Sequence, residues 1–192
     1  MLIFLVKRMR RATKQNSNTN LHKIANTIFT SQTFVPRKVF FAVGKASHED
    51  PLISFELALR DAGIEKFNLV QVTSVLPFGC EVIDKSSGLK ELTPGQIVFC
   101  VMARKTSNEA GKKIYATIGV AMPNKPSQNG YLTEYYGYYT DENVEEYAEH
   151  AATLMFESAF GEKPLKSFSV SSKAVVEKNK HTTVVAAAIL LL

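Results

Sequence analysis

A pair of hydroxyl residues, Thr73-Ser74, closes the apolar run that begins at Asn68 and that Pro77 interrupts. A serine hydroxyl becomes a nucleophile when a neighbouring group can take its proton. Serine and threonine are also common at turns, where their hydroxyls bond to nearby backbone. The dipeptide by itself therefore favours a turn, and only its surroundings can strengthen the catalytic interpretation.

Other common catalytic motifs are absent from the sequence. None of GxGxxG, GxxxxGK[ST], GxSxG, HExxH or CxxC occurs. Cys80 and Cys100 form neither a disulfide framework nor a metal knuckle. The four histidines lie far apart in the chain (His22, His48, His150 and His181). We therefore expect no structural metal.

The positive charge is concentrated at the amino terminus. Residues 1–40 contain eight basic side chains and no acid, whereas residues 41–192 contain the other 15 basic groups and all 18 acids. A nucleic-acid-binding domain usually has a basic face of its own. The tyrosines of 131–139 have no interleaved basic residues, so we expect them to pack rather than stack on bases. We expect no nucleic-acid partner.

Hydrophobic periodicity and turn signals predict an α+β fold, a layered α/β/β/α sandwich with helices on the outer faces of the sheets. Asp50-Pro51 begins a first helix and Gly63 ends it. A second helix begins at Thr140-Asp141-Glu142 and stops at Gly161. The predicted strands are 38–44, 67–76 (a buried strand), 96–103, 114–122, 130–139, 165–176 and 181–192.

Apolar spacing predicts which faces are buried. The expected core faces are Leu52, Phe55, Leu59 and Ala62 in the first helix, and Val144, Ala148, Ala151, Met155 and Ala159 in the second. The last strand is apolar on both alternating faces, so it must be covered on both sides. It is too short for a membrane anchor, and we expect no membrane partner.

Residues 1–36 are expected to form a disordered basic extension, and 37–192 the functional domain. The apolar run at the start precedes its charges, which is the reverse of a secretory signal. The composition faintly resembles an organelle transit peptide, but a frayed extension or a misassigned start fits better. We expect a cytoplasmic protein.

Six ordered blocks from Arg37 to Leu192 resemble the pyruvoyl-dependent arginine decarboxylase family. They are Val39–Gly44, Phe55–Ile64, Asn68–Pro77, Gly119–Pro123, Gly130–Tyr135 and the Ala-rich terminal strand. The resemblance implies self-cleavage into 1–73 and 74–192, with Ser74 converted into a covalent pyruvoyl cofactor. It also implies decarboxylation of L-arginine to agmatine and CO2 through a Schiff base on that group, in homotrimers that share active sites between neighbours.

The same resemblance assigns roles to three further residues. Glu134 matches the proton donor, Asn68 a residue that assists processing, and Glu56 the carboxylate that binds the substrate guanidinium. Each has an ordinary structural alternative. Glu134 suits a solvent-facing strand, Asn68 a turn at a strand edge, and Glu56 a surface ion pair with Arg60 four residues later.

Two positions depart from the family pattern. Glu56 replaces the usual Asp, and Thr73 replaces the first Ser of the usual Ser-Ser pair. The longer Glu56 side chain leaves open a decarboxylase for another basic or small amino acid. A further alternative is an unprocessed, non-catalytic relative that serves as a binding subunit.

Overall fold

The computed structural model describes residues 34–140 and 143–192, and Pro36–Leu192 form one compact unit. Residues 1–33 of the predicted extension lie outside the described residues, as does Asp141-Glu142. The elements are β1 (Lys38–His48), α2 (Pro51–Ala62), β2 (Asn68–Gln71), β3 (Val75–Leu76), β4 (Glu81–Val82), α3 (Lys85–Lys90), β5 (Ile97–Ser107), β6 (Lys113–Met122), β7 (Gly130–Tyr138), α4 (Val144–Phe160), β8 (Lys166–Val175) and β9 (His181–Leu191).

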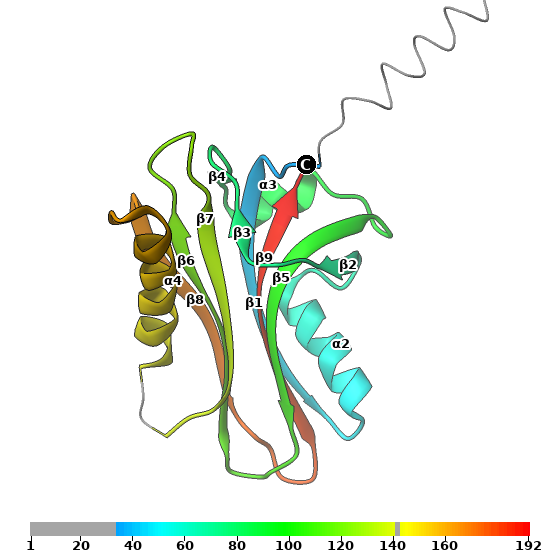
Figure 1. Cartoon of the computed structure of the whole chain (residues 1–192). Helices are drawn as coiled ribbons and strands as arrows, with labels where there is room; N and C mark the ends of the chain where they lie inside the picture. The colour runs from blue at the N-terminus through cyan, green and yellow to red at the C-terminus, as the bar shows by residue number, and fades with distance from the viewer. Residues whose placement is uncertain (1–33, 141–142) are drawn as a thin grey trace, which may run out of the picture. The chain divides into compact units, whose positions relative to one another are not determined.

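The strands form two sheets, which confirms the predicted mixed α+β class. The five-stranded sheet has the order β2-β5-β9-β1-β4, and the four-stranded sheet has the order β3-β7-β6-β8. Helix α2 contacts β1, β9 and β5, whereas α4 contacts β6, β7 and β8. The two helices lie on opposite sides of the pair of sheets (Figure 1).

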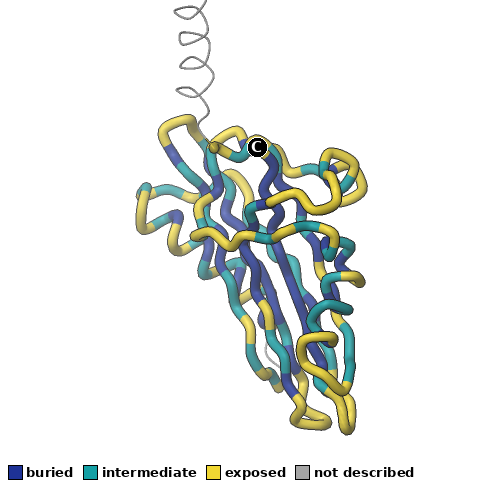
Figure 2. Tube along the Cα trace, turned by 90° about the vertical axis from the view of Figure 1, so that its right-hand side faces the viewer, coloured by how far each residue is buried: buried dark blue, intermediate teal, exposed yellow. Residues whose placement is uncertain are grey.

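Strand β9 lies at the centre of the five-stranded sheet, antiparallel to both β1 and β5. Thr182 to Leu191 are all buried. Alternate β9 residues belong to a cluster between the sheets and to a cluster that includes residues of α2. The expectation that this strand is covered on both faces is therefore confirmed, and its buried path is visible in Figure 2.

Both helices are bounded by capping residues. The Asp50 side chain accepts hydrogen bonds from Leu52 N and Ile53 N, and Gly63 adopts the left-handed conformation that ends α2, as predicted. Helix α4 instead begins after Asn143, whose side chain accepts from Glu146 N. The start predicted at Thr140 was too early, because Asn143 provides the cap.

The predicted buried faces of the helices were partly wrong. In α2 the buried residues are Ser54, Ala58 and Ala62, while Leu52 is 74% exposed. In α4 they are Val144, Ala148, Ala152 and Phe156, so Ala151, Met155 and Ala159 are off the core face. Small residues dominate the buried face of α2, whereas in α4 the large Phe156 also packs against Ala121 of β6.

The predicted strand 67–76 was also wrong as a single buried element. It divides into β2, which pairs in parallel with β5, and β3, which pairs antiparallel with β7 in the other sheet. Most of β2 is exposed because it is an edge strand. The short elements β4 and α3 were not predicted, because runs of two and six residues carry little periodicity. None of the helices in the described part of the chain is both long and apolar enough to cross a membrane.

Gly119 lets α4 pack directly on β6. A methyl group there would collide with the Ala148 carbonyl oxygen, whereas one at Gly137 on β7 would meet Tyr115 at an ordinary 3.5 Å. We expect Gly119→Ala to lower the free energy of unfolding by about 1–3 kcal/mol, the usual cost of overpacking. The matched Gly137→Ala should change it far less. Urea unfolding at one protein concentration measures both, and equal stability of the two variants would contradict this packing.

Candidate active site

The chain crosses from one sheet to the other between β2 and β3, as Figure 1 shows. Val72 N donates to Cys100 O at 2.9 Å, the last such bond to the five-stranded sheet. Leu132 N donates to Ser74 O at 2.9 Å, the first to the four-stranded sheet. Thr73 is therefore the one residue between two backbone anchors, and it is exposed.

Ser74 and Glu134 meet at this crossover. The Ser74 hydroxyl donates to Glu134 Oε2 at 2.6 Å, and both side chains are half-buried. Glu134 lies on β7, two residues after Leu132, so both side chains point to the same face of the sheet. Leu132 belongs to the core cluster between the sheets. The carboxylate is thus within the distance at which a general base can accept a hydroxyl proton.

Asn68 does not join this pair within one chain. It is exposed at the start of β2, and its Nδ2 donates to Gly95 O at 2.7 Å. Asn68 and Thr73 are five positions apart along largely extended chain, which rises about 3.3 Å per residue. The residues predicted from the sequence therefore lie at two separate sites within one chain. Ser74 and Glu134 are at the crossover, and Asn68 is at the start of β2.

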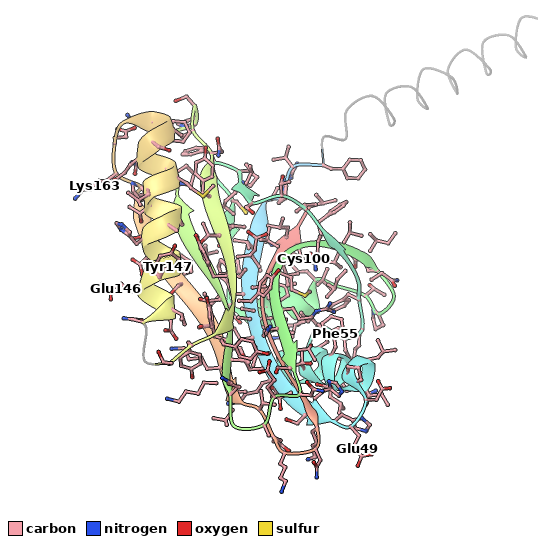
Figure 3. The ribbon with its side chains drawn as sticks, turned by 60° about the horizontal axis from the view of Figure 1, so that its bottom comes forward. Glu49, Phe55, Cys100, Glu146, Tyr147 and Lys163 are labelled. Carbon is pink, nitrogen blue, oxygen red and sulfur yellow. The ribbon has the colours of Figure 1, made fainter. Side chains whose placement is uncertain are left out.

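Asn68 lines an open groove of about 770 Å³ beside α2. The groove is lined by residues of α2, the approach to β2, β2 itself, β5 and β7, namely Phe55, Leu59, Phe67–Gln71, Met102, Arg104, Thr106 and Tyr136. Its volume is in the range of small-molecule sites. Phe55 on α2 and Cys100 on β5, both labelled in Figure 3, belong to the packing between helix and sheet on this side.

Arg104 is the groove residue that sequence reasoning missed. It is exposed, and its guanidinium carbon lies 4.3 Å from the centre of the Phe55 ring, a cation–π contact. The sequence carries no signal that Arg104 would contact Phe55, because several other elements separate β5 from α2 along the chain. The same holds for Tyr136, which lines the groove from the other sheet.

Glu56 lies on α2 and forms the ion pair that was the alternative interpretation of this residue. Arg60 Nε donates to Glu56 Oε1 at 2.7 Å, and the two side chains are 62% and 42% exposed respectively. Glu56 adjoins Phe55, whose side chain lines the groove. Glu56 itself is not among the residues that line the groove, and its ion-pair partner is Arg60.

Neither cysteine competes with Ser74 as a nucleophile. Cys80 and Cys100 are both buried and unpaired. Burial raises the pKa of each thiol to about 11, so the reactive thiolate is scarce near neutral pH. Among residues 34–140 and 143–192, no three His, Cys, Asp or Glu side chains gather in a way that would hold a metal ion.

Comparison with known proteins identifies the family. The family model described as pyruvoyl-dependent arginine decarboxylase matches residues 38–192. A pyruvoyl-dependent arginine decarboxylase 1 of Archaeoglobus fulgidus is 56% identical over 158 residues, which cover 82% of this chain and 99% of the relative. One from Methanosarcina acetivorans is 48% identical over 162 residues, covering 82% and 97%. The chain belongs to the pyruvoyl-dependent arginine decarboxylase family.

Proposed function

We propose that this protein is a self-processing pyruvoyl-dependent arginine decarboxylase, which converts L-arginine to agmatine and CO2. The observation that carries the proposal is the 2.6 Å hydrogen bond from the Ser74 hydroxyl to Glu134 at the crossover between the sheets. It occurs in a chain of this family, and the matched relatives are named for this reaction.

The bond changes of maturation begin with groups that lie at the crossover. Glu134 takes the hydroxyl proton, Ser74 Oγ bonds to the Thr73 carbonyl carbon, and the Thr73–Ser74 C–N bond breaks as the nitrogen is protonated. The resulting ester loses the Ser74 α-proton and its Cβ–Oγ bond, which releases Thr73 as a new carboxyl terminus. One water then replaces the nitrogen of residue 74, which leaves as ammonia, and the ketone of a pyruvoyl group remains.

The surroundings of Ser74 fit a cofactor formed from it. The side chain is half-buried and directed at a carboxyl group. A pyruvoyl group at position 74 would supply a carbonyl that takes up the electron pair left when CO2 departs. Glu134 is then the residue placed to hold a proton at Oε2 and deliver it to the substrate carbon. The carboxyl group thus serves first as a base and later as an acid.

Asn68 and Glu56 complete the proposed site only if another protomer provides them. Within one chain, Asn68 lines the groove beside α2, whose lining does not include Ser74, and Glu56 is paired with Arg60 on that helix. Exposed apolar side chains flank this region, at Val70, Val72 and Tyr136. We therefore propose a homotrimer of cleaved protomers, in which Asn68 assists processing and Glu56 binds the substrate guanidinium at shared sites. Mass measurement under native conditions tests the trimer.

The fold is proposed to be the four-layer α/β/β/α sandwich, with α2 and α4 as outer layers, since each helix contacts a different sheet. The functional domain is proposed to span 37–192, and a chain that begins at Pro36 should still fold and cleave itself. We propose a cytoplasmic location, to be checked by cell fractionation. Two unpaired buried cysteines suit that reducing compartment.

The first prediction concerns self-cleavage. The purified protein should consist of two fragments, residues 1–73 and residues 74–192, the second beginning with a pyruvoyl group and therefore resistant to Edman sequencing. Ser74→Ala removes the nucleophile and should leave an intact chain in denaturing mass spectrometry. Cleavage at this bond in Ser74→Ala would exclude the mechanism. An intact, uncleaved wild-type protein would favour the non-catalytic binding subunit.

Replacing Glu134 tests its role as proton donor. Glu134→Gln keeps the shape but has no proton of the required acidity, so decarboxylation should fall by roughly 10²–10⁴-fold. Because Glu134 also faces Ser74 before cleavage, the rate must be expressed per mole of pyruvoyl group. Normal turnover by cleaved Glu134→Gln would remove this residue from the mechanism.

Substrate choice depends on Glu56 in this proposal. A guanidinium binds a carboxylate through two charge-assisted hydrogen bonds of about 1.5–3 kcal/mol each. Glu56→Gln should therefore raise the KM for arginine about ten- to a hundredfold without affecting self-cleavage, and Glu56→Asp should be at least as active as wild type. Lysine should be a poor substrate, because an ammonium lacks the planar fork.

Arg60→Ala is the matched control for Glu56. It breaks the same ion pair but keeps the carboxylate. If Glu56 were only a surface residue paired with Arg60, both variants would have equally small effects on KM. Faster turnover of lysine or of a small neutral amino acid than of arginine would instead favour the alternative of a decarboxylase for another substrate.

A further inference from the structure

The carbonyl group that would be attacked during cleavage already accepts a hydrogen bond. Val75 N donates to Thr73 O at 3.0 Å, which closes a three-residue turn centred on Ser74. Among the described residues, Asn179 is the one non-glycine residue with positive φ, so Ser74 has negative φ. The turn is therefore of the inverse γ type, a relaxed conformation common at strand ends.

The Val75 amide is available because the neighbouring ladder does not use it. Val75 lies opposite Tyr131 in the β3–β7 pair. The adjacent ladder bond runs from Leu132 N to Ser74 O. In an antiparallel pair, this arrangement makes Val75 and Tyr131 a non-hydrogen-bonded pair, with the Val75 N–H pointing away from β7. It points instead to Thr73 O.

Among the described residues of one chain, no side chain donates a hydrogen bond to Thr73 O. Asn68 Nδ2 is engaged by Gly95 O. A carbonyl oxygen has two lone pairs, so the Val75 bond leaves one free for the processing role proposed for Asn68.

We propose that the backbone N–H of Val75 is the oxyanion donor for self-cleavage. When Ser74 Oγ bonds to the Thr73 carbonyl carbon, the π electrons move onto Thr73 O, and the hydroxyl proton goes to Glu134 Oε2. The negative charge then lies on the atom at which Val75 N–H is aimed, so the hydrogen bond strengthens as the C–N bond prepares to break. The inference rests on the proposed self-cleavage.

The donor is held in place before the reaction begins. Leu132 N fixes the Ser74 carbonyl on one side of the turn, and Cys100 O fixes Val72 N on the other. A donor that needs no reorganisation stabilises developing charge more than a mobile side chain does. The Val75 side chain itself is 46% exposed and has no part in this arrangement.

Replacing a single backbone N–H by oxygen tests the donor. The full chain is produced by cell-free translation with Val75 replaced by its α-hydroxy acid analogue, and cleavage of the intact precursor is followed by mass spectrometry. Removal of one oxyanion donor should slow cleavage at the Thr73–Ser74 bond by roughly 10²–10³-fold. Hydrolysis of the introduced ester would give fragments 1–74 and 75–192, which have different masses and are counted separately.

Val176, which lies outside the crossover, provides a control of the same residue type. Its α-hydroxy acid analogue loses the bond from Val176 N to Lys112 O, a backbone hydrogen bond of 2.9 Å. Cleavage of this control should stay within about tenfold of the unmodified chain. Equal slowing of the two analogues, or an unslowed Val75 analogue, would overturn the inference. Failure of the unmodified chain to cleave would instead refute the proposed function.

Two genetically encoded variants cover the case in which an ester analogue does not fold. Val75→Pro also removes the N–H, and Val75→Ala keeps it. Once matched by circular dichroism to the unmodified chain, Val75→Pro should cleave roughly 10²–10³-fold more slowly, and Val75→Ala at a near-normal rate. Similar rates for Pro and Ala would show that the N–H is not the donor.

Discussion

The passage of the chain between two sheets within three residues is the constraint on which the site depends. Val72 is still hydrogen-bonded to β5, and Ser74 is already hydrogen-bonded to β7. Thr73 lies between these two anchored residues, so both sheets fix its position. The peptide bond between Thr73 and Ser74 is thereby held at a fixed position relative to β7, and the Glu134 carboxylate on that strand meets the Ser74 hydroxyl.

The packing of both sheets maintains that crossover. Residues between the sheets form one continuous cluster, to which β5, β6, β7 and β9 contribute. Behind the four-stranded sheet, Thr133 Oγ1 donates to Ala148 O on α4 at 2.9 Å. Thr133 precedes Glu134, so the helix and the core hold opposite faces of the strand that carries the carboxylate. The geometry at Ser74 is therefore a product of the whole domain rather than of the local sequence.

Sequence patterns predicted the elements whose signals are local. The cap at Asp50, the stop at Gly63 and the two-sided burial of β9 follow from capping chemistry and from the lack of polar alternation. The division of 67–76 could not be predicted, because an apolar run looks the same whether it stays in one sheet or changes sheets. The family resemblance linked Ser74 with Glu134, but no spacing rule could place Asn68 apart from them or bring Arg104 onto Phe55.

In the proposed mechanism, one carboxylate oxygen serves two reactions in a fixed order. Before cleavage, Glu134 Oε2 accepts a hydrogen bond of 2.6 Å from the Ser74 hydroxyl, the group whose proton it takes during maturation. Conversion of Ser74 removes that hydroxyl, because its oxygen leaves with the Thr73 carboxyl group. Glu134 Oε2 then has no hydroxyl partner on residue 74 and is free to hold the proton that decarboxylation requires. Maturation thus creates the electron-accepting group and releases its acid in a single event, which gives a physical reason for one glutamate to have both roles.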